Sequence, residues 1–522
     1  MNAVVLVILV PFLTAIGTAL LHDRPRAESA LNAASCVGLA AFVFWLLAKV
    51  DADGPQVSMM GGYAAPYGIA FVADRLSCIM LCLSMAVASV VAFYVPWTLT
   101  PLQQSHFFYP LFQVLLLGVN WSFITGDLFN LFVSYEVMLI GSYGIMMCGA
   151  SRQQVRQTLT YVAINLLGGS LFVIGLGLVY SIVGTLNMAD IAVVTSRLGE
   201  PRAGMLTAAS MVLLVVFALK AAAFPLFFWL PDSYPIVPLG VNGFFAGLLT
   251  KVGIYSLLRV FVMTFRQPGN ELALGILLVA SAFTMVVGVL GALCQWEIRR
   301  VLSWHIISQV GYMVMGIGLA ADAGIATAAI AATIFYVVHH IIVKASLFLV
   351  GGVAEEISGS GRLKEMGGVA IAAPGAAALF FVAALSLAGM PPFSGFLAKL
   401  VLVRAALRGS HGWIVASAVA TSFLTLLSMM KIWSYAFWGS WHGSPPRPLW
   451  RRMAAPVSVL VAATVLLGIF AQPFLRLAAD AARGVVDPVD YVHAVLGPDA
   501  TTARRDVAVH VASAPRATGV RP

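Results

Sequence analysis

The chain has 522 residues, of which 61% are hydrophobic and only 10% are charged. Soluble globular proteins carry charge on about a quarter of their residues, so this composition excludes a soluble fold and predicts a surface that faces lipid. The formal net charge of +9 comes from Lys and Arg residues scattered through short polar breaks, which fits lipid headgroups and membrane topology and argues against nucleic acid as a partner.

Apolar runs long enough to cross a hydrocarbon core of about 30 Å recur along the whole sequence. The first run lacks the basic segment and the cleavage site of a signal peptide, so we expect it to remain as the first helix. We predict an all-α polytopic membrane protein with about fourteen transmembrane helices. The predicted spans are 2–21, 29–49, 76–97, 107–124, 128–148, 158–183, 204–223, 236–264, 272–293, 301–320, 325–350, 373–408, 412–438 and 454–475.

Two of these spans, the seventh and the twelfth, are interrupted by proline. Pro225 follows the seventh span, and Pro391 and Pro392 fall in the middle of the twelfth. Proline removes a backbone donor and clashes with the preceding turn, so both helices should break there. Freed backbone groups are tolerated at membrane depth only where protein or a hydrated cavity satisfies them. The sequence therefore predicts two discontinuous helices, each beside a cavity.

The two interrupted helices are five spans apart, which indicates an internal repeat. An odd number of helices in each unit inverts the second copy. We expect helices 1–3 over 1–106, a first repeat of helices 4–8 over 107–264, a second, inverted repeat of helices 9–13 over 272–438, and helix 14 over 454–475. Residues 476–522 read as a polar, partly disordered tail.

Basic residues between the spans predict the orientation of the chain. Connections that follow odd-numbered helices hold about twice as many as those that follow even-numbered ones. Both termini are therefore expected on the periplasmic side of a bacterial inner membrane. The basic residues after odd-numbered helices are Arg24, Arg26, Arg152, Arg156, Arg299, Arg300, Arg362, Lys364, Arg447, Arg451 and Arg452.

Ionisable side chains inside spans are costly, about 2.5–3.5 kcal/mol each on insertion scales, so each is a candidate functional residue. Spread over successive helices of both repeats, they could form a row across the membrane. The residues singled out are Glu136, Lys220, Lys251, His305, His339, His340, Lys344, Lys399 and Lys431.

Glu136 in the fifth span and Lys220 beside the first break carry opposite charges. Burial disfavours the ammonium form of a lysine, and a neighbouring carboxylate favours it. A lysine that moves toward and away from a carboxylate would therefore take up and release a proton. The alternative is a static ion pair that fixes two helices together.

The second half offers a further pair on one helix. His340 and Lys344 are four residues apart and share a face, whereas His339 points about 100° away. An imidazole beside a lysine could relay protons. Histidines hydrogen-bonded across a helix interface are the alternative, and for His305 the two readings are evenly matched.

Other charged residues fit structural roles better. Lys431 lies near aromatic residues and is expected to extend toward a membrane interface. Asp127 is expected to cap the fifth helix, and Asp232 is a loop or cap residue. Lys251 lies in an otherwise apolar stretch, so it stays a candidate site.

Sequence signatures of soluble enzymes are absent. The chain has no nucleotide-binding GxxxxGK[ST] and no HExxH, and its five cysteines lie in apolar stretches without metal-ligand spacing. We therefore expect no cofactor, no metal site and no enzymatic activity in this chain.

Several longer motifs carry a family resemblance. The segments are Thr125 to Glu136 (TGDLFNLFVSYE), Lys220 to Tyr234 (KAAAFPLFFWLPDSY), Leu249 to Tyr255 (LTKVGIY), Ser303 to Tyr312 (SWHIISQVGY) and His339 to Leu349 (HHIIVKASLFL). Over about residues 65–440 the chain resembles the antiporter-like membrane subunits of the respiratory complex I superfamily. Within it, the resemblance is strongest to the D-type subunits of the multisubunit Na+/H+ antiporters of the Mrp/Mnh type.

The resemblance implies fourteen helices, inverted repeats with discontinuous helices 7 and 12, and a proton path. In that family the path uses a glutamate of helix 5 and lysines of helices 7, 8 and 12, which match Glu136, Lys220, Lys251 and Lys399 here. The segment 234–238 departs from the family's usual loop. The family also implies further membrane subunits as partners, with protons and monovalent cations as the transported species.

Two functions remain open on these grounds. The first is a proton-translocating subunit of a heteromeric monovalent cation (Na+)/proton antiporter. The second is a proton-pumping subunit of a redox-driven complex, such as complex I or a membrane-bound hydrogenase. Copurifying flavin and iron–sulfur subunits would favour the second, and small membrane partners without chromophores the first. The candidate path for either is Glu136, Lys220, Lys251, His340, Lys344 and Lys399.

Overall fold

A computed structural model describes residues 3–149, 151–441 and 449–498. Arg447 and the expected tail from residue 499 onward lie outside these ranges. In the described part the chain is helical apart from one antiparallel hairpin, β1 (Gln56–Met59) and β2 (Ala70–Ala73), in which Val57 lies opposite Val72.

The first eight membrane crossings follow the predicted spans. They are α1 (Leu6–Leu20), α2 (Pro25–Asp53), α3 (Arg75–Tyr94), α5 (Phe108–Ile124), α6 (Leu128–Met147), α7 (Arg152–Val183), α9 (Glu200–Ala221), and a continuous rod of α11 (Leu239–Phe244), η5 (Phe245–Leu249), α12 (Thr250–Leu257) and η6 (Leu258–Thr264).

Six further crossings complete the bundle. They are α13 (Asn270–Cys294), α14 (Ile298–Gly318), α15 (Ala326–Ser358), the pair α17 (Pro374–Ala388) and α18 (Ser394–Arg408), α19 (Gly412–Ile432) with η8 (Trp433–Phe437), and α20 (Leu449–Ile469). Twelve of the described helices are long and apolar enough to span a membrane, and α5 and the α17–α18 pair bring the crossings to the predicted fourteen.

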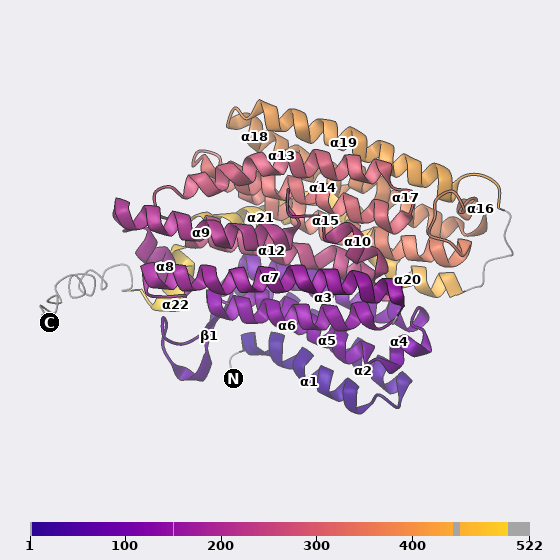
Figure 1. The fold of residues 1–522 in the computed structure, drawn as a ribbon, viewed down its shortest axis with the longest axis horizontal. Coiled ribbons are helices and arrows are strands. Elements are labelled where there is room, and N and C mark those ends of the chain that lie inside the picture. Colours follow the sequence, from indigo (N-terminus) through magenta and orange to yellow (C-terminus); the bar gives the residue numbers. More distant parts are fainter. Residues whose placement is uncertain (1–2, 150, 442–448, 499–522) are drawn as a thin grey trace, which may run out of the picture.

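The helices run side by side between two ends of the bundle (Figure 1). One end, here called the α8 end, gathers β1, α8 (Met188–Thr195) and α22 (Val489–Leu496). The other, the α16 end, holds α4 (Pro101–Ser105) and α16 (Val369–Ala372). Because the crossings alternate, α6 runs from the α8 end to the α16 end, and α14 runs the opposite way.

The two repeats share packing details as well as helix order. A Cβ at Gly141 would meet the backbone nitrogen of Leu115, 2.6 Å away, and a Cβ at Gly311 would meet that of Met285, 2.7 Å away. Isolated bridges join Asp127 to Asn187 in the first repeat and Glu297 to Arg362 in the second. The first bridge lies at the α8 end and the second at the α16 end, as expected for inverted copies.

Both predicted helix breaks are present. Helix α9 ends at Ala221, and Ala222 has a left-handed backbone with φ of 59°. Helix α17 ends at Ala388, and Gly389 follows with φ of 88°. Each left-handed residue precedes the critical proline, Pro225 or Pro392, by three positions. The breaks are therefore equivalent, which fixes the alignment of the two repeats at this point.

The centre of the bundle is α15, which packs against α3, α11, α14, α17, α18, α20 and α21 (Ala471–Val486). The rod from α11 to η6 is almost wholly buried beside it. Gly247 of this rod faces Ile341 and Ala345, so small residues let the two central helices approach closely. These two helices carry most of the buried cations described below.

The first part of the expected polar tail is helical. Residues 476–496 lie largely in two helices, α21 and α22. Helix α21 packs against α15 and α3, and its buried side chains Ala478, Ala481, Ala482 and Val485 recur at helical spacing. The average polarity of the segment hid this amphipathic pattern.

Candidate functional site: a row of buried cations

The first part of the row lies between α6, α7 and α9. Glu136 and Lys220 line one small cavity of about 20 Å³ together with Asn165 and Gly169. The Lys220 ammonium has no hydrogen-bond partner among the described residues and lies 6.0 Å from the ring centres of Tyr135 and Tyr161. The two opposite charges thus share a cavity without direct contact.

The break after α9 explains how Lys220 is held. The last turn of this helix leaves backbone carbonyls without their usual donors. The indole Nε1 of Trp229 donates to the carbonyl of Leu219 at 3.0 Å, and the backbone nitrogen of Phe224 donates to Thr284 at 2.9 Å. These two bonds tie the break to its surroundings, and Lys220 lies in the last helical turn before it.

Lys251 lies in the central rod, between two segments of π-helix. Its ammonium donates to the carbonyl of Ala246, five residues earlier, at 2.8 Å. A wider π turn leaves such a carbonyl available, and π segments recur at functional sites. A Cβ at Gly253 would meet the backbone of Lys220 and Ala221, so the rod packs directly on the first break.

Lys344 and His340 of α15 lie next in the row. Lys344 donates to the carbonyl of Leu302 at 3.0 Å, and both nitrogens of His340 are without partners among the described residues. Lys251 lies close enough to act electrostatically on both. His305 of α14 bonds Ser428 at 2.9 Å and also lies within the field of Lys344. Its hydrogen bond across a helix interface fits the structural reading of this histidine.

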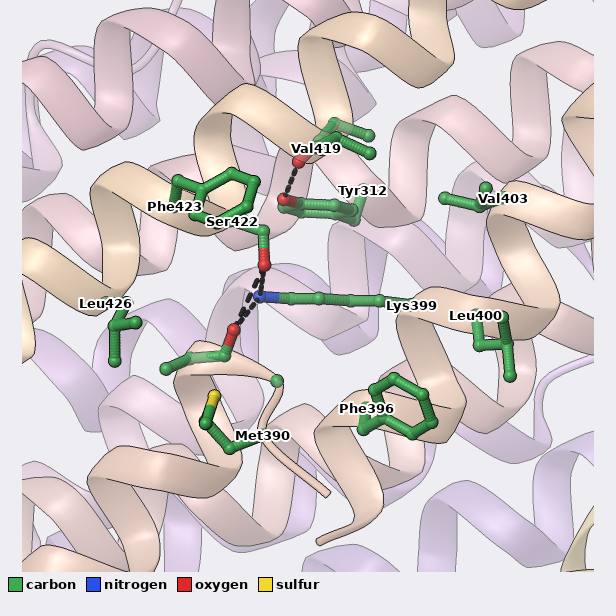
Figure 2. Close-up of a pocket in the computed structure, with 13 residues that line it drawn as sticks. Tyr312, Met390, Phe396, Lys399, Leu400, Val403, Val419, Ser422, Phe423 and Leu426 are labelled. Carbon is green, nitrogen blue, oxygen red and sulfur yellow. Dashed lines mark hydrogen bonds between the residues drawn. The ribbon is translucent and has the colours of Figure 1, made fainter. Parts of the chain in front are cut away.

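Lys399 ends the row at the second break. Its side chain runs from α18 back to the end of α17, where the ammonium donates to the carbonyls of Leu387 at 3.1 Å and Ala388 at 2.9 Å. It also donates to Ser422 Oγ at 2.9 Å (Figure 2). Tyr312 lies beside it, 5.3 Å from ring centre to nitrogen. A cavity of about 310 Å³ is lined by Lys399, Ala388, Ser422 and Tyr312, and its lining includes the exposed Phe423.

His339 was absent from the predicted path but contacts the second break. Its Nδ1 lies 2.8 Å from Ser394 Oγ, which in turn lies 2.7 Å from Thr464 of α20 and 3.3 Å from Ser386. The break therefore holds a chain of hydroxyl groups that ends on an imidazole. The serines on either side of the prolines were the available sequence signal.

Three charged residues have structural roles. Asp127 caps α6 through the backbone nitrogen of Asn130 at 2.9 Å, as expected. Asp232 forms a half-exposed ion pair with Arg300 at 3.0 Å. Lys431, expected to extend toward a membrane interface, reaches the end of α13. There it donates to the carbonyls of Leu293 at 2.7 Å and Gln295 at 2.6 Å, because those groups lack helical donors.

Two ion pairs, one buried and one partly buried, were missed by the sequence analysis. Arg259, which lies inside the predicted span 236–264, pairs with Asp74. Arg299 binds Glu355 at 2.6 Å and also donates to the carbonyls of Pro235, at 3.0 Å, and Val237, at 3.3 Å. This arginine thus holds the segment 234–238 that departs from the family pattern. Arg259 could have been found, because it is a charge within an apolar span.

Two inverted repeats around broken helices, with cationic side chains buried between them, define a membrane transporter fold. A family model described as NADH:quinone oxidoreductase/Mrp antiporter, TM, matches residues 125–425. The D-type subunit of the Na(+)/H(+) antiporter of Alkalihalophilus pseudofirmus is 42% identical over 498 residues, which cover 95% of this chain and 99% of that protein. The chain therefore belongs to the NADH:quinone oxidoreductase/Mrp antiporter family of membrane subunits.

Solved structures give the same fold. A chain in the Mrp complex from Dietzia sp. DQ12-45-1b superposes with a TM-score of 0.88 at 33% identity, covering 95% of this chain and 99% of that one. A chain in the membrane-bound sulfane sulfur reductase, an archaeal respiratory membrane complex, superposes with a TM-score of 0.87 at 23% identity, covering 95% and 100%. The second likeness concerns the fold alone.

Proposed function

We propose that this chain is the proton-translocating subunit of a heteromeric monovalent cation (Na+)/proton antiporter. The observation that carries the proposal is the set of buried lysines Lys220, Lys251, Lys344 and Lys399, which lie on helices of both repeats. Relatives named as D-type subunits of Na(+)/H(+) antiporters, matched over nearly their whole length, support antiport over redox-driven pumping.

Protons move along the row by changes in pairing. When Lys220 moves closer to Glu136, the carboxylate stabilises the ammonium more strongly, and when they separate that stabilisation weakens. In this structure the two groups share a cavity without a direct ion pair. The small cavity between them leaves room for a change of side-chain position. Lys251, His340 and Lys344 lie within electrostatic range of one another, so a charge arriving on one changes the proton affinity of the next.

The direct test uses Glu136→Gln and Lys220→Ala in the assembled complex. Both variants should abolish cation-dependent proton flux in everted vesicles while the complex still assembles, because each removes one partner of the switch. Asp232→Asn is the matched control, since it removes a carboxylate from a half-exposed ion pair. Wild-type flux in an assembled Glu136 or Lys220 variant would exclude the switch.

The proposed activity belongs to a complex of membrane subunits. The structure of the Mrp complex from Dietzia sp. contains a chain with this fold. We expect the purified single chain to give no ion-selective exchange in liposomes. The row of buried cations needs other membrane subunits to connect it to both membrane surfaces. Robust exchange by the isolated chain would contradict this.

The chain is a multi-pass membrane protein, and we place it in the inner membrane of a bacterial cell with the α8 end outside. The α16 end holds the starts of α2, α7 and α14, with Arg26, Arg152 and Arg299. Excess positive charge marks the cytoplasmic side. Cysteine labelling at Ser410, on the opposite end, from outside intact cells is the test.

A further inference from the structure

A buried arginine lies on the same helical rod as Lys251, eight residues further toward the α8 end. Lys251, Tyr255 and Arg259 follow at intervals of four residues and share one face. The guanidinium of Arg259 binds both carboxylate oxygens of Asp74, and its Nε donates to the Tyr255 hydroxyl at 2.9 Å. Arg259 is 1% exposed and Asp74 is 8% exposed. The pair therefore stands between the central lysine and this end of the bundle.

The pair is tied to three separate parts of the fold. Asp74 links β2 to α3 and caps that helix through the backbone nitrogen of Ser77 at 2.9 Å. The Ser77 hydroxyl receives a second bond from Arg259 at 2.9 Å. Tyr255 donates from its hydroxyl to the carbonyl of Phe123, at the end of α5, at 2.5 Å. Because these groups already bind one another, none is left free toward Lys251.

The C-terminal helix α22 covers the pair from the outside. The ring of Tyr491 lies 5.5 Å from the guanidinium carbon of Arg259. The Tyr491 hydroxyl lies 3.0 Å from the place a Cβ would take at Gly126, in the α5–α6 link. Helix α22 itself packs on α8 and β1. A residue that is distant in sequence thus closes the surface above the ion pair.

The space between the pair and Lys251 is apolar and small. A cavity of about 10 Å³ lies between Lys251 and Tyr255 and is otherwise lined by aliphatic side chains, among them Met80 and Ile334. A water molecule needs about 10–15 Å³ and two or more polar partners. The described side chains between Lys251 and Tyr255 thus leave space for at most about one water molecule and offer it few polar partners. Proton passage at this point therefore requires these side chains to move.

We propose that Asp74, Arg259 and Tyr491 form a seal that closes the proton path between Lys251 and the α8 end of the protein. This inference rests on the proposed function, because it assumes that Lys251 carries protons. A static clamp that only holds α3, η6 and α22 together is the competing explanation. Weakening the Asp74–Arg259 pair should raise the passive proton permeability if the pair is a seal, and should leave it unchanged if the pair is only a clamp.

The test measures proton leak through the assembled complex in proteoliposomes. A pH gradient is imposed without any cation gradient, the membrane potential is clamped with valinomycin and K+, and decay of the gradient is followed with an internal pH dye. Asp74→Asn weakens the pair, and Tyr491→Ala removes the cover while keeping both charges. Both variants should accelerate the decay several-fold. The double variant Asp74→Asn with Lys251→Ala should return the decay to the wild-type rate, because protons that leak through the weakened seal must pass through Lys251.

The matched control is Arg75→Ala, which breaks the neighbouring exposed ion pair with Asp51, 2.8 Å apart, at the same end of α3. It should leave the leak unchanged. Wild-type leak rates in assembled Asp74→Asn and Tyr491→Ala would overturn the seal, and so would a leak that persists without Lys251. If Asp74→Asn fails to assemble, Tyr491→Ala decides. Cation/proton exchange by wild type is measured in the same vesicles, so failure of the proposed function is seen separately.

Discussion

The two broken helices hold their lysines in different ways. Lys220 precedes its break, lies in a small cavity with Glu136 and makes no hydrogen bond to any described residue. Lys399 follows its break and binds three neutral oxygen atoms, and no carboxylate of the described chain forms an ion pair with it. The first repeat thus has a cation that shares a cavity with a carboxylate without bonding it, and the second a cation bound by three neutral oxygen atoms.

The alignment of the breaks shows that the two ammonium groups occupy related places. Lys220 stands two residues before the left-handed Ala222, and Leu387 stands two residues before the left-handed Gly389. The Lys399 ammonium donates to the carbonyl of Leu387, the residue that corresponds to Lys220. The long Lys399 side chain starts from the second half-helix and therefore places its charge at the end of the first half-helix. The position of a residue relative to a break therefore does not fix where its charge lies.

The largest expected effect comes from Lys399→Arg. A guanidinium keeps its proton at every usable pH, so the variant should assemble but lose cation-dependent proton flux down to background. Lys431→Arg is the matched control, because Lys431 also binds backbone carbonyls, at the end of α13, but lies outside the proposed row. Flux near wild type in assembled Lys399→Arg complexes would remove this residue from the path.

The packing likeness of the repeats can be tested with Gly141→Ala and Gly311→Ala. Each added methyl group would meet backbone atoms of the neighbouring helix, so each should lower the free energy of unfolding by about 1–3 kcal/mol. Denaturant titration in detergent measures this. Gly177→Ala is the control, since open space surrounds that position. A large loss in only one of the two repeats would show that their helix contacts are not equivalent.

A smaller effect is expected where the first break is tied. Trp229→Phe removes the bond to the carbonyl of Leu219 and should destabilise the break by about 1 kcal/mol, with a few-fold loss of exchange. Trp413→Phe, at an exposed position, should change neither the stability nor the exchange rate. Thermal unfolding and exchange rates of the assembled complex check both variants. An unchanged rate would mean that Lys220 does not depend on this tie.

The smallest effect is expected from Ser422→Ala. It removes one of three acceptors of the Lys399 ammonium and leaves both carbonyls, so exchange should change by about 0.5–1.5 kcal/mol of activation free energy, roughly two- to tenfold. Ser181→Ala, an exposed serine bonded within its own helix, is the control. A complete loss of flux would show that the hydroxyl itself carries protons.

The sequence by itself determined the membrane class, the fourteen crossings and the two breaks. Length and hydropathy dictate spans because lipid offers no partner to a free backbone group, and proline marks the breaks by the same rule. A charge within an apolar span is conspicuous, so the sequence also singled out Lys220, Lys251 and Lys399. The family resemblance indicates the same three residues. These are local properties of the chain, readable one segment at a time.

Tertiary structure alone decided which groups meet. The sequence does not show that Lys399 reaches back across its break, that Lys431 binds the end of α13, or that Asp74 lies against Arg259. Nor does it show that Tyr491 covers that ion pair, because helix α22 falls in a stretch that reads as a polar tail. These contacts join residues far apart in sequence, and their partners are set by how the helices pack and where broken turns leave carbonyl groups free.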